Sequence, residues 1–254
     1  LWAETYGDQL YASFDNGEYE SEYHVFASGV DTARPVGLMV FADGSGGDGF
    51  YNPRSPYQLD AGGEDGLVAV ARKHNMILLT PVAPPPGCDY DGNLRRNRGD
   101  NANCWYDPDN ARGKAQWSSD LLHHVKSEFD IEFDRVVVGG FSSGAQWATQ
   151  FWAPAHGEEH EVDLTVAIGY GGAPVATPKF SEGYKSETAF AWDTGTADHA
   201  YRTDQYGSIG GYNWYTDHGF QTHATWPPGV DHPRPGEFHL IMDREITRVF
   251  GAPR

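Results

Sequence analysis

One segment of the 254-residue chain restricts its possible folds more than any other. Residues 135–145 read RVVVGGFSSGA, an apolar run, then a Gly-Phe-Ser-Ser-Gly turn, then a helical pattern beginning at Ser143. This order predicts a buried strand, a tight turn and a helix. A serine in such a turn is typical of an acyl-transfer nucleophile, because the flanking glycines allow close backbone approach. Ser142 is therefore the candidate nucleophile; the alternative is an ordinary turn serine.

The rest of the chain alternates apolar runs with amphipathic stretches, which predicts an α/β fold with a mostly parallel central sheet and helices on both faces. The expected strands are 22–27, 36–42, 76–82, 135–140, 164–170, 188–194 and 220–226. The expected helices are 64–74, 116–129 with Ser118 or Ser119 near its start, 143–152 stopped by Pro154, and 237–250. The stretch 84–113 has no regular period and indicates a functional loop. This length fits one domain over 1–254.

The charge excludes several classes of partner. Lys and Arg together number 18 and Asp and Glu number 36, so the formal net charge is -18. Such a surface repels nucleic acid and anionic membranes. No apolar run approaches the roughly 18 residues that a membrane span requires. We therefore expect a monomer that binds neither nucleic acid nor membrane.

Two cysteines, Cys88 and Cys104, lie in the same polar loop. A loop rich in Gly, Asn and Asp favours a stapling disulfide over a buried thiol pair, with two free thiols as the alternative. No further cysteine or well-spaced histidine completes a tetrahedral metal set. The sequence thus predicts a disulfide and no metal or other cofactor.

A serine hydroxyl needs a base and an acid that orients the base. The expected strand 188–194 leads into Gly-Thr-Ala-Asp, which places Asp198 at the carboxyl edge of the sheet as the candidate acid. The alternative is that Asp198 is only a helix cap for the segment beginning near Tyr201. Asp193 lies within the strand and is less suitable.

Two histidines compete for the role of base. His232 follows the expected strand 220–226 in a loop, where a general base belongs. His223 is the alternative, but the strand assignment buries it, and a structural histidine is common at such a position. We favour His232.

Two further groups of residues complete the candidate site. A tetrahedral intermediate needs two N–H donors, for which we choose the backbone of Ser143 and of Ser45, with Gly44 as the neighbour of Ser45. The glycine-rich turn after strand 36–42 supplies the second donor; the alternative is an ordinary glycine loop. Candidate substrate-binding residues are Trp105, Trp147 and Trp226, each of which is equally suited to the core.

These features together resemble the secreted polyhydroxybutyrate depolymerase and feruloyl esterase group of α/β-hydrolases. The resemblance rests on the nucleophile segment 133–144, the acid segment 195–198, Asn-Cys-Trp at 103–105 and Ala-Asp-Gly-Ser at 42–45. Asp43 stands where the family often has His, and Ser45 where Cys is frequent. The family often has its base in a Gly-His-Thr-Trp-Pro-Gly segment, whereas Trp-Pro-Pro-Gly here lies between His223 and His232.

The resemblance implies a secreted serine esterase of the α/β-hydrolase fold that acts through an acyl-enzyme. Its substrates would be polyesters, such as polyhydroxyalkanoates, or feruloyl and acetyl esters of the plant wall. An acyltransferase on the same scaffold, or a noncatalytic protein that binds a polymer or carbohydrate, remains an alternative. The start of the chain at Leu1 fits a mature form after signal removal or a shortened chain.

Overall fold

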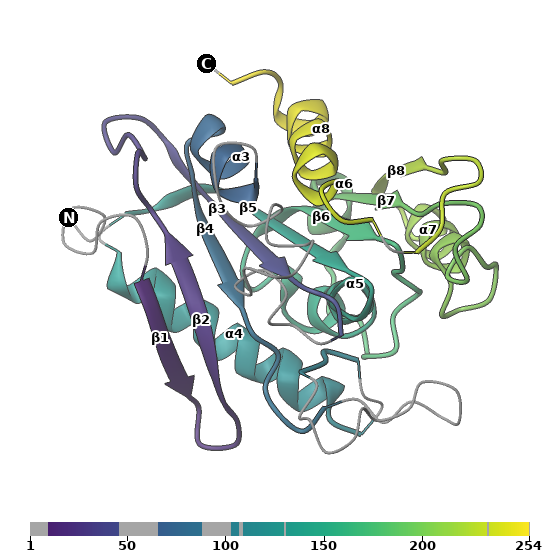
Figure 1. The fold of residues 1–254 in the computed structure, drawn as a ribbon, viewed down its shortest axis with the longest axis horizontal. Helices are drawn as coiled ribbons and strands as arrows, with labels where there is room; N and C mark the ends of the chain where they lie inside the picture. Colours follow the sequence, from purple (N-terminus) through teal and green to yellow (C-terminus); the bar gives the residue numbers. More distant parts are fainter. Residues whose placement is uncertain are drawn as a thin grey trace.

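The computed structural model describes residues 10–45, 66–87, 103–106, 109–129, 131–232 and 234–253. Their eight-stranded sheet has the order β1-β2-β4-β3-β5-β6-β7-β8 (Figure 1). The strands are β1 Leu10–Asp15, β2 Glu20–Phe26, β3 Val36–Ala42, β4 Met76–Pro81, β5 Phe133–Phe141, β6 Val162–Ile168, β7 Ala189–Asp193 and β8 Gln221–Thr225. The pairs β1–β2 and β2–β4 are antiparallel and all others are parallel, so the expected α/β class is confirmed.

The helices are α3 Leu67–Lys73, α4 Ala111–Glu128, α5 Ser143–Gln146, the π-helix η1 Trp147–Gly157, α6 Glu182–Glu187, α7 Ser208–Asp217 and α8 Phe238–Phe250. They lie on both faces of the sheet, with α3 and α8 on the side opposite α4 (Figure 1). Within the part of the chain that the structure describes, no helix has the length and apolarity needed to cross a membrane.

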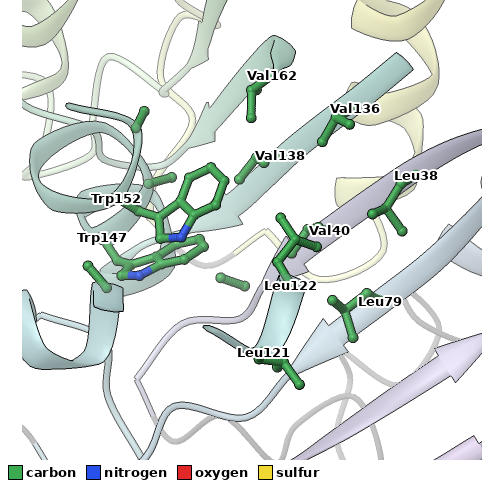
Figure 2. Packing of buried hydrophobic residues seen from close by; sticks show 14 of the residues in the cluster. Leu38, Val40, Leu79, Leu121, Leu122, Val136, Val138, Trp147, Trp152 and Val162 are labelled. Carbon is green, nitrogen blue, oxygen red and sulfur yellow. The ribbon is translucent and has the colours of Figure 1, made fainter. Parts of the chain in front are cut away.

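The two-residue period of β3 explains how one strand contributes to two cores. Leu38 and Val40 belong to the cluster under α4 and η1, whereas Met39 and Phe41 belong to the cluster under α3 and α8. Figure 2 shows the first cluster, in which residues of α4 and η1 pack on the central strands. A strand buried on both faces must be apolar throughout. Burial of each large apolar side chain contributes about 1.5–3 kcal/mol to the free energy of unfolding.

The sheet prediction was correct except at its edge. Strand β3 has the expected bounds. The ends of the other expected strands differ from the observed ends by about two residues or less, which is the usual uncertainty of element boundaries. Strand β1 was missed. Among the described strands it pairs with β2 alone, and an edge strand with little buried surface carries a weak apolar pattern.

Helix α4 begins at Ala111, five residues before the expected start at Gln116. Ser118 and Ser119 therefore lie within the helix and do not cap it, and the last residues of the expected loop 84–113 are helical. The reason is tertiary: the buried Lys114 Nζ donates to the carbonyl oxygens of Cys104 and Pro86, both at 2.6 Å. Such contacts fix a first turn that local propensity alone does not indicate.

Pro154 does not stop the helix after the serine turn, contrary to our expectation. It lies inside η1, which continues to Gly157. In an α-helix the proline ring collides with the carbonyl four residues earlier, and the wider π-helical turn relieves that collision. Helices α6 and α7 were also missed; α7 contains Gly210 and Gly211, which weaken any helical signal.

Candidate active site

The candidate site lies at the carboxyl edge of the parallel strands. Ser142 follows β5 directly and has φ 52° and ψ −115°, a conformation that a non-glycine residue rarely adopts. Its N–H donates to the carbonyl of Ile168 at the end of β6, 2.9 Å away. A Cβ at Gly140 would collide with the Gly144 backbone, and a Cβ at Gly144 would collide with the backbone of Ala42. The two glycines are therefore required by close packing of the turn.

The structure brings the three expected catalytic residues together. The Ser142 Oγ atom lies 2.9 Å from His232 Nε2, and His232 Nδ1 lies 2.8 Å from Asp198 Oδ2. His232 is on the loop after β8 and Asp198 on the loop after β7, at neighbouring strand ends. With Nδ1–H donating to the carboxylate, Nε2 is free of its proton and can accept the Ser142 hydroxyl proton.

Asp198 has a second contact that bears on its alternative role. Its Oδ1 accepts the N–H of Ala200 at 2.8 Å, and its residue exposure is only 4%. The residues after it form turns, and no helix begins near Tyr201. One carboxylate oxygen therefore binds the backbone of its own turn while the other contacts His232, and the alternative of a helix cap is wrong.

His223 lies in the middle of β8, as expected, but it is not buried. Strand β8 is at the edge of the sheet, and 37% of the His223 side chain is exposed. Its Nδ1 faces Glu245 Oε2 of α8 at 3.1 Å. The structure therefore joins His232, and not His223, to Ser142.

The expected oxyanion donors are partly in place. Ser143 is the first residue of α5, so its N–H has no acceptor within that helix. Gly44 is close to the nucleophile, because a Cβ on it would lie 3.3 Å from Ser142 Cβ. However, the Gly44 N–H donates to Asp43 Oδ1 at 2.7 Å, which leaves Ser45 as the better candidate for the second donor. Ser45 is exposed at the end of β3, and its hydroxyl contacts Cys104 Sγ at 3.4 Å.

Two of the three expected substrate-binding tryptophans belong to the core. Trp105 and Trp147 have exposures of 0% and 1%, and their rings pack 4.8 Å apart. They are inaccessible because both belong to the buried cluster that contains the apolar residues of α4 and η1. Trp226 is half-buried and packs against Tyr201, 5.4 Å away, so it remains a candidate. Cys88 lies outside the described residues, and the disulfide with Cys104 stays a prediction.

Three side chains around His232 were missed by sequence reasoning. Phe141 stacks on the imidazole with ring centroids 5.1 Å apart, and Tyr170 meets it edge-on at 6.3 Å. His199 lies 4.6 Å from the His232 ring, and its Nδ1 is 3.3 Å from Asp198 Oδ1. Burial raises the pKa of Tyr170 and lowers that of His199. The available signals were their positions: Phe141 ends β5, Tyr170 lies two residues after β6, and His199 follows Asp198.

A buried ion pair anchors the loop that carries His232. Arg234, two residues later, pairs with Asp193 at the end of β7 and donates from Nε to Glu237 at 2.7 Å. Arg244 of α8 also donates to Asp193, at 2.7 Å. Asp193, which we considered a weaker acid candidate, thus pairs with two arginines. Its two cationic partners compensate its burial at 1% exposure.

The fold recurs in solved structures. No protein-family model matches the chain, and no curated protein matches it. A structure described as a ferulic acid esterase aligns with TM-score 0.60 and 16% identity over 95% of this chain and 98% of that one. A thermostable esterase aligns with TM-score 0.59 and 17% identity over 97% of this chain, and an arylesterase with 0.58 and 12% over 96%. The chain spans 64% of the thermostable esterase and 86% of the arylesterase. The chain therefore has the α/β-hydrolase fold.

Proposed function

We propose that this protein is a serine carboxylic-ester hydrolase that works through an acyl-enzyme. The observation that carries the proposal is the unbroken contact series from Ser142 Oγ through His232 to Asp198, with distances of 2.9 and 2.8 Å. Hydroxyl, imidazole and carboxylate in this order form the arrangement that activates a serine. The carboxylate and the strained backbone of Ser142 are held by contacts independent of any substrate, so the geometry is prepared in advance.

The reaction has two halves. His232 Nε2 takes the proton of Ser142 as Oγ attacks the ester carbonyl, and the tetrahedral oxyanion receives N–H bonds from Ser143 and Ser45. The imidazolium then protonates the departing alcohol oxygen as the C–O bond breaks, leaving an acyl-serine. Water, deprotonated by the same imidazole, releases the acid and restores Ser142. Asp198 holds the ring and stabilises its charged form. No residue role in this sequence of steps requires a metal or an organic cofactor.

The substrates that we propose are polyesters or feruloyl and acetyl esters of the plant wall, hydrolysed outside the cell. Feruloyl esters are the first to test. Tyr170 and the aromatic pair Trp226 and Tyr201 lie on loops that carry the site, and aromatic rings favour planar acyl groups. The similarity to a structure named as a ferulic acid esterase agrees with this order of testing. An extracellular location also accords with the net charge of -18, which keeps a protein soluble.

The decisive experiment combines labelling with turnover. A fluorophosphonate should modify Ser142, and peptide mass spectrometry will locate the adduct. Ser142→Ala should abolish the label and lower hydrolysis of short nitrophenyl esters by about 10⁴-fold or more, with unfolding unchanged. The neighbouring serine offers a matched control: Ser143→Ala keeps the backbone N–H and should still be labelled. Labelling of another residue, or turnover that survives Ser142→Ala, would overturn the proposal.

A further inference from the structure

A second group of histidines lies away from the candidate active site, between α4 and the end of η1. His123 projects from α4, while His156, Glu159 and His160 follow one another around the last turn of η1 and the residues after it. His123 Nε2 lies 2.9 Å from Glu159 Oε1, and the rings of His123 and His160 are 4.4 Å apart. One ligand atom from each of His123, Glu159 and His160 lies within 4.8 Å of the others.

The surroundings of this group hold its members in place. His156 Nδ1 lies 3.2 Å from Glu159 Oε2, so the carboxylate has one oxygen toward His156 and the other toward His123. Ser119 Oγ contacts His160 Nε2 at 2.7 Å, whereas the buried Nδ1 of His160 has no hydrogen-bond partner. A buried ring nitrogen normally finds a partner, and a metal ion at Nδ1 would supply one while Ser119 accepted Nε2–H.

The charges around the group are mixed. Lys126 Nζ donates to the His160 carbonyl oxygen at 3.2 Å. Asp120 of α4 adds a negative charge near His156.

We propose that His123, Glu159 and His160 form a zinc site, with His156 as the residue that positions Glu159. Two imidazoles and one carboxylate match the ligand preference of Zn²⁺, which binds them at about 2.0–2.1 Å. Drawing the three atoms onto one ion requires small movements of His123 and Glu159, whose side chains are 54% and 50% exposed. The buried His160, at 1% exposure, provides the fixed ligand.

The ion would stabilise the fold and would take no part in the reaction of Ser142. Helix α4 packs along η1, and η1 continues directly from α5, the helix that begins beside the nucleophile. An ion held by one ligand from α4 and two from the turn directly after η1 would join the two helices at a single point. Because the ion binds only the folded arrangement, it should raise stability as its concentration rises above the dissociation constant.

The test uses the full chain, stripped with a chelator and dialysed. Titration with Zn²⁺ by calorimetry should give one site, and the melting temperature should rise by about 5 °C at roughly 100 times the dissociation constant. Co²⁺ in place of Zn²⁺ should give visible absorption bands of a low-coordinate ion. His123→Ala, at an exposed position, should weaken binding by about 100-fold or more, and His156→Gln by about 10–100-fold.

Two histidine variants serve as matched controls. His124→Gln replaces the histidine next to His123 on α4 and should leave the affinity for Zn²⁺ unchanged. His199→Gln addresses the other group that could hold an ion, Asp198, His199 and His232 of the candidate active site. Absence of zinc binding by the stripped protein, or binding that His199→Gln abolishes and His123→Ala preserves, would overturn the proposal. Either result leaves the labelling of Ser142 as a separate test of the hydrolase.

Discussion

His232 and His223 were the two candidates for the base, and each faces a carboxylate, but only His232 also contacts Ser142. His232 meets Asp198 at 2.8 Å on loops beyond β7 and β8, and its other nitrogen contacts Ser142. His223 meets Glu245 at 3.1 Å on the body of β8 and α8. The two pairs have similar chemistry and differ in their position relative to the carboxyl ends of the strands.

The surroundings of the two carboxylates explain the difference in role. Asp198 receives a backbone N–H and leaves its second oxygen to His232. Glu245 is also bound by Arg244 and Arg248, both at 2.8 Å, so its charge is already compensated and the pair serves to attach α8 to the sheet. A histidine beside a carboxylate therefore indicates catalysis only where the other ring nitrogen faces a nucleophile.

The largest expected effect separates the two histidines. His232→Ala removes the only base that contacts Ser142 Oγ among the described residues and should lower kcat/KM for a nitrophenyl ester by about 10⁴-fold or more. His223→Ala should change kcat/KM by less than about threefold. Steady-state kinetics on folded variants measures both. A larger loss for His223→Ala would reverse our assignment of the two pairs.

Substitution of the two carboxylates, Asp198 and Glu245, should change kcat almost as unequally as substitution of the two histidines. Asp198→Asn keeps the shape of the side chain but favours the wrong histidine tautomer, and kcat should fall by about 10⁴-fold. Glu245→Gln should lower stability and leave kcat within about threefold of wild type. Chemical denaturation measured beside kcat will separate the two effects. Equal losses of kcat would mean that both carboxylates act on the reaction.

A third comparison concerns the arginines that attach each pair to the protein. Arg234→Met removes the buried one of the two arginines that pair with Asp193 and should destabilise the protein by about 3 kcal/mol. Because the loop that carries His232 would shift, kcat should change more than KM. Arg248→Met is the matched control; Arg248 is 34% exposed, and its loss should cost about 1 kcal/mol with kcat retained. An unchanged kcat in folded Arg234→Met would show that the ion pair stabilises the fold without positioning His232.

The smallest expected effect is on the free energy of unfolding at acid pH. Burial opposes ionisation of Glu245, but hydrogen bonds from Arg248 and Arg244 outweigh burial and hold its pKa below the ordinary value of 4.5. A lowered pKa in the folded state means that the stability from ionised Glu245 is complete above about pH 4.5 and is lost as the pH falls through the folded-state pKa. Denaturation between pH 6 and 3 should therefore show a shallower decline for Glu245→Gln than for wild type. Parallel curves would contradict this role for Glu245.

Much of the fold could be predicted because the signal is local. The two-sided burial of β3 and β5 requires continuous apolar runs, which are visible without a structure. The same holds for Ser142, whose flanking glycines meet the backbone so closely that no side chain would fit. Asp198 and His232 were found because each follows a strand at the edge where parallel strands end.

Other features depended on contacts distant in sequence. Local pattern did not reveal the early start of α4, which rests on Lys114 and two carbonyls from residues up to 28 positions away. Nor did it reveal that Pro154 lies inside a helix. The sequence around Trp105 and Trp147 does not distinguish a core residue from a pocket residue, because burial depends on which other segments pack over the side chain.

From the sequence alone come the α/β class, the serine turn and the order nucleophile, acid, base, since each follows from local periodicity or from required glycines. Only the tertiary structure decided between His232 and His223, assigned Asp193 to an ion pair and placed His123 beside Glu159 and His160. The physical reason is that a hydrogen bond or a metal ion selects atoms within about 3 Å. Residues 90 positions apart, such as Ser142 and His232, come that close only through the packing of the sheet.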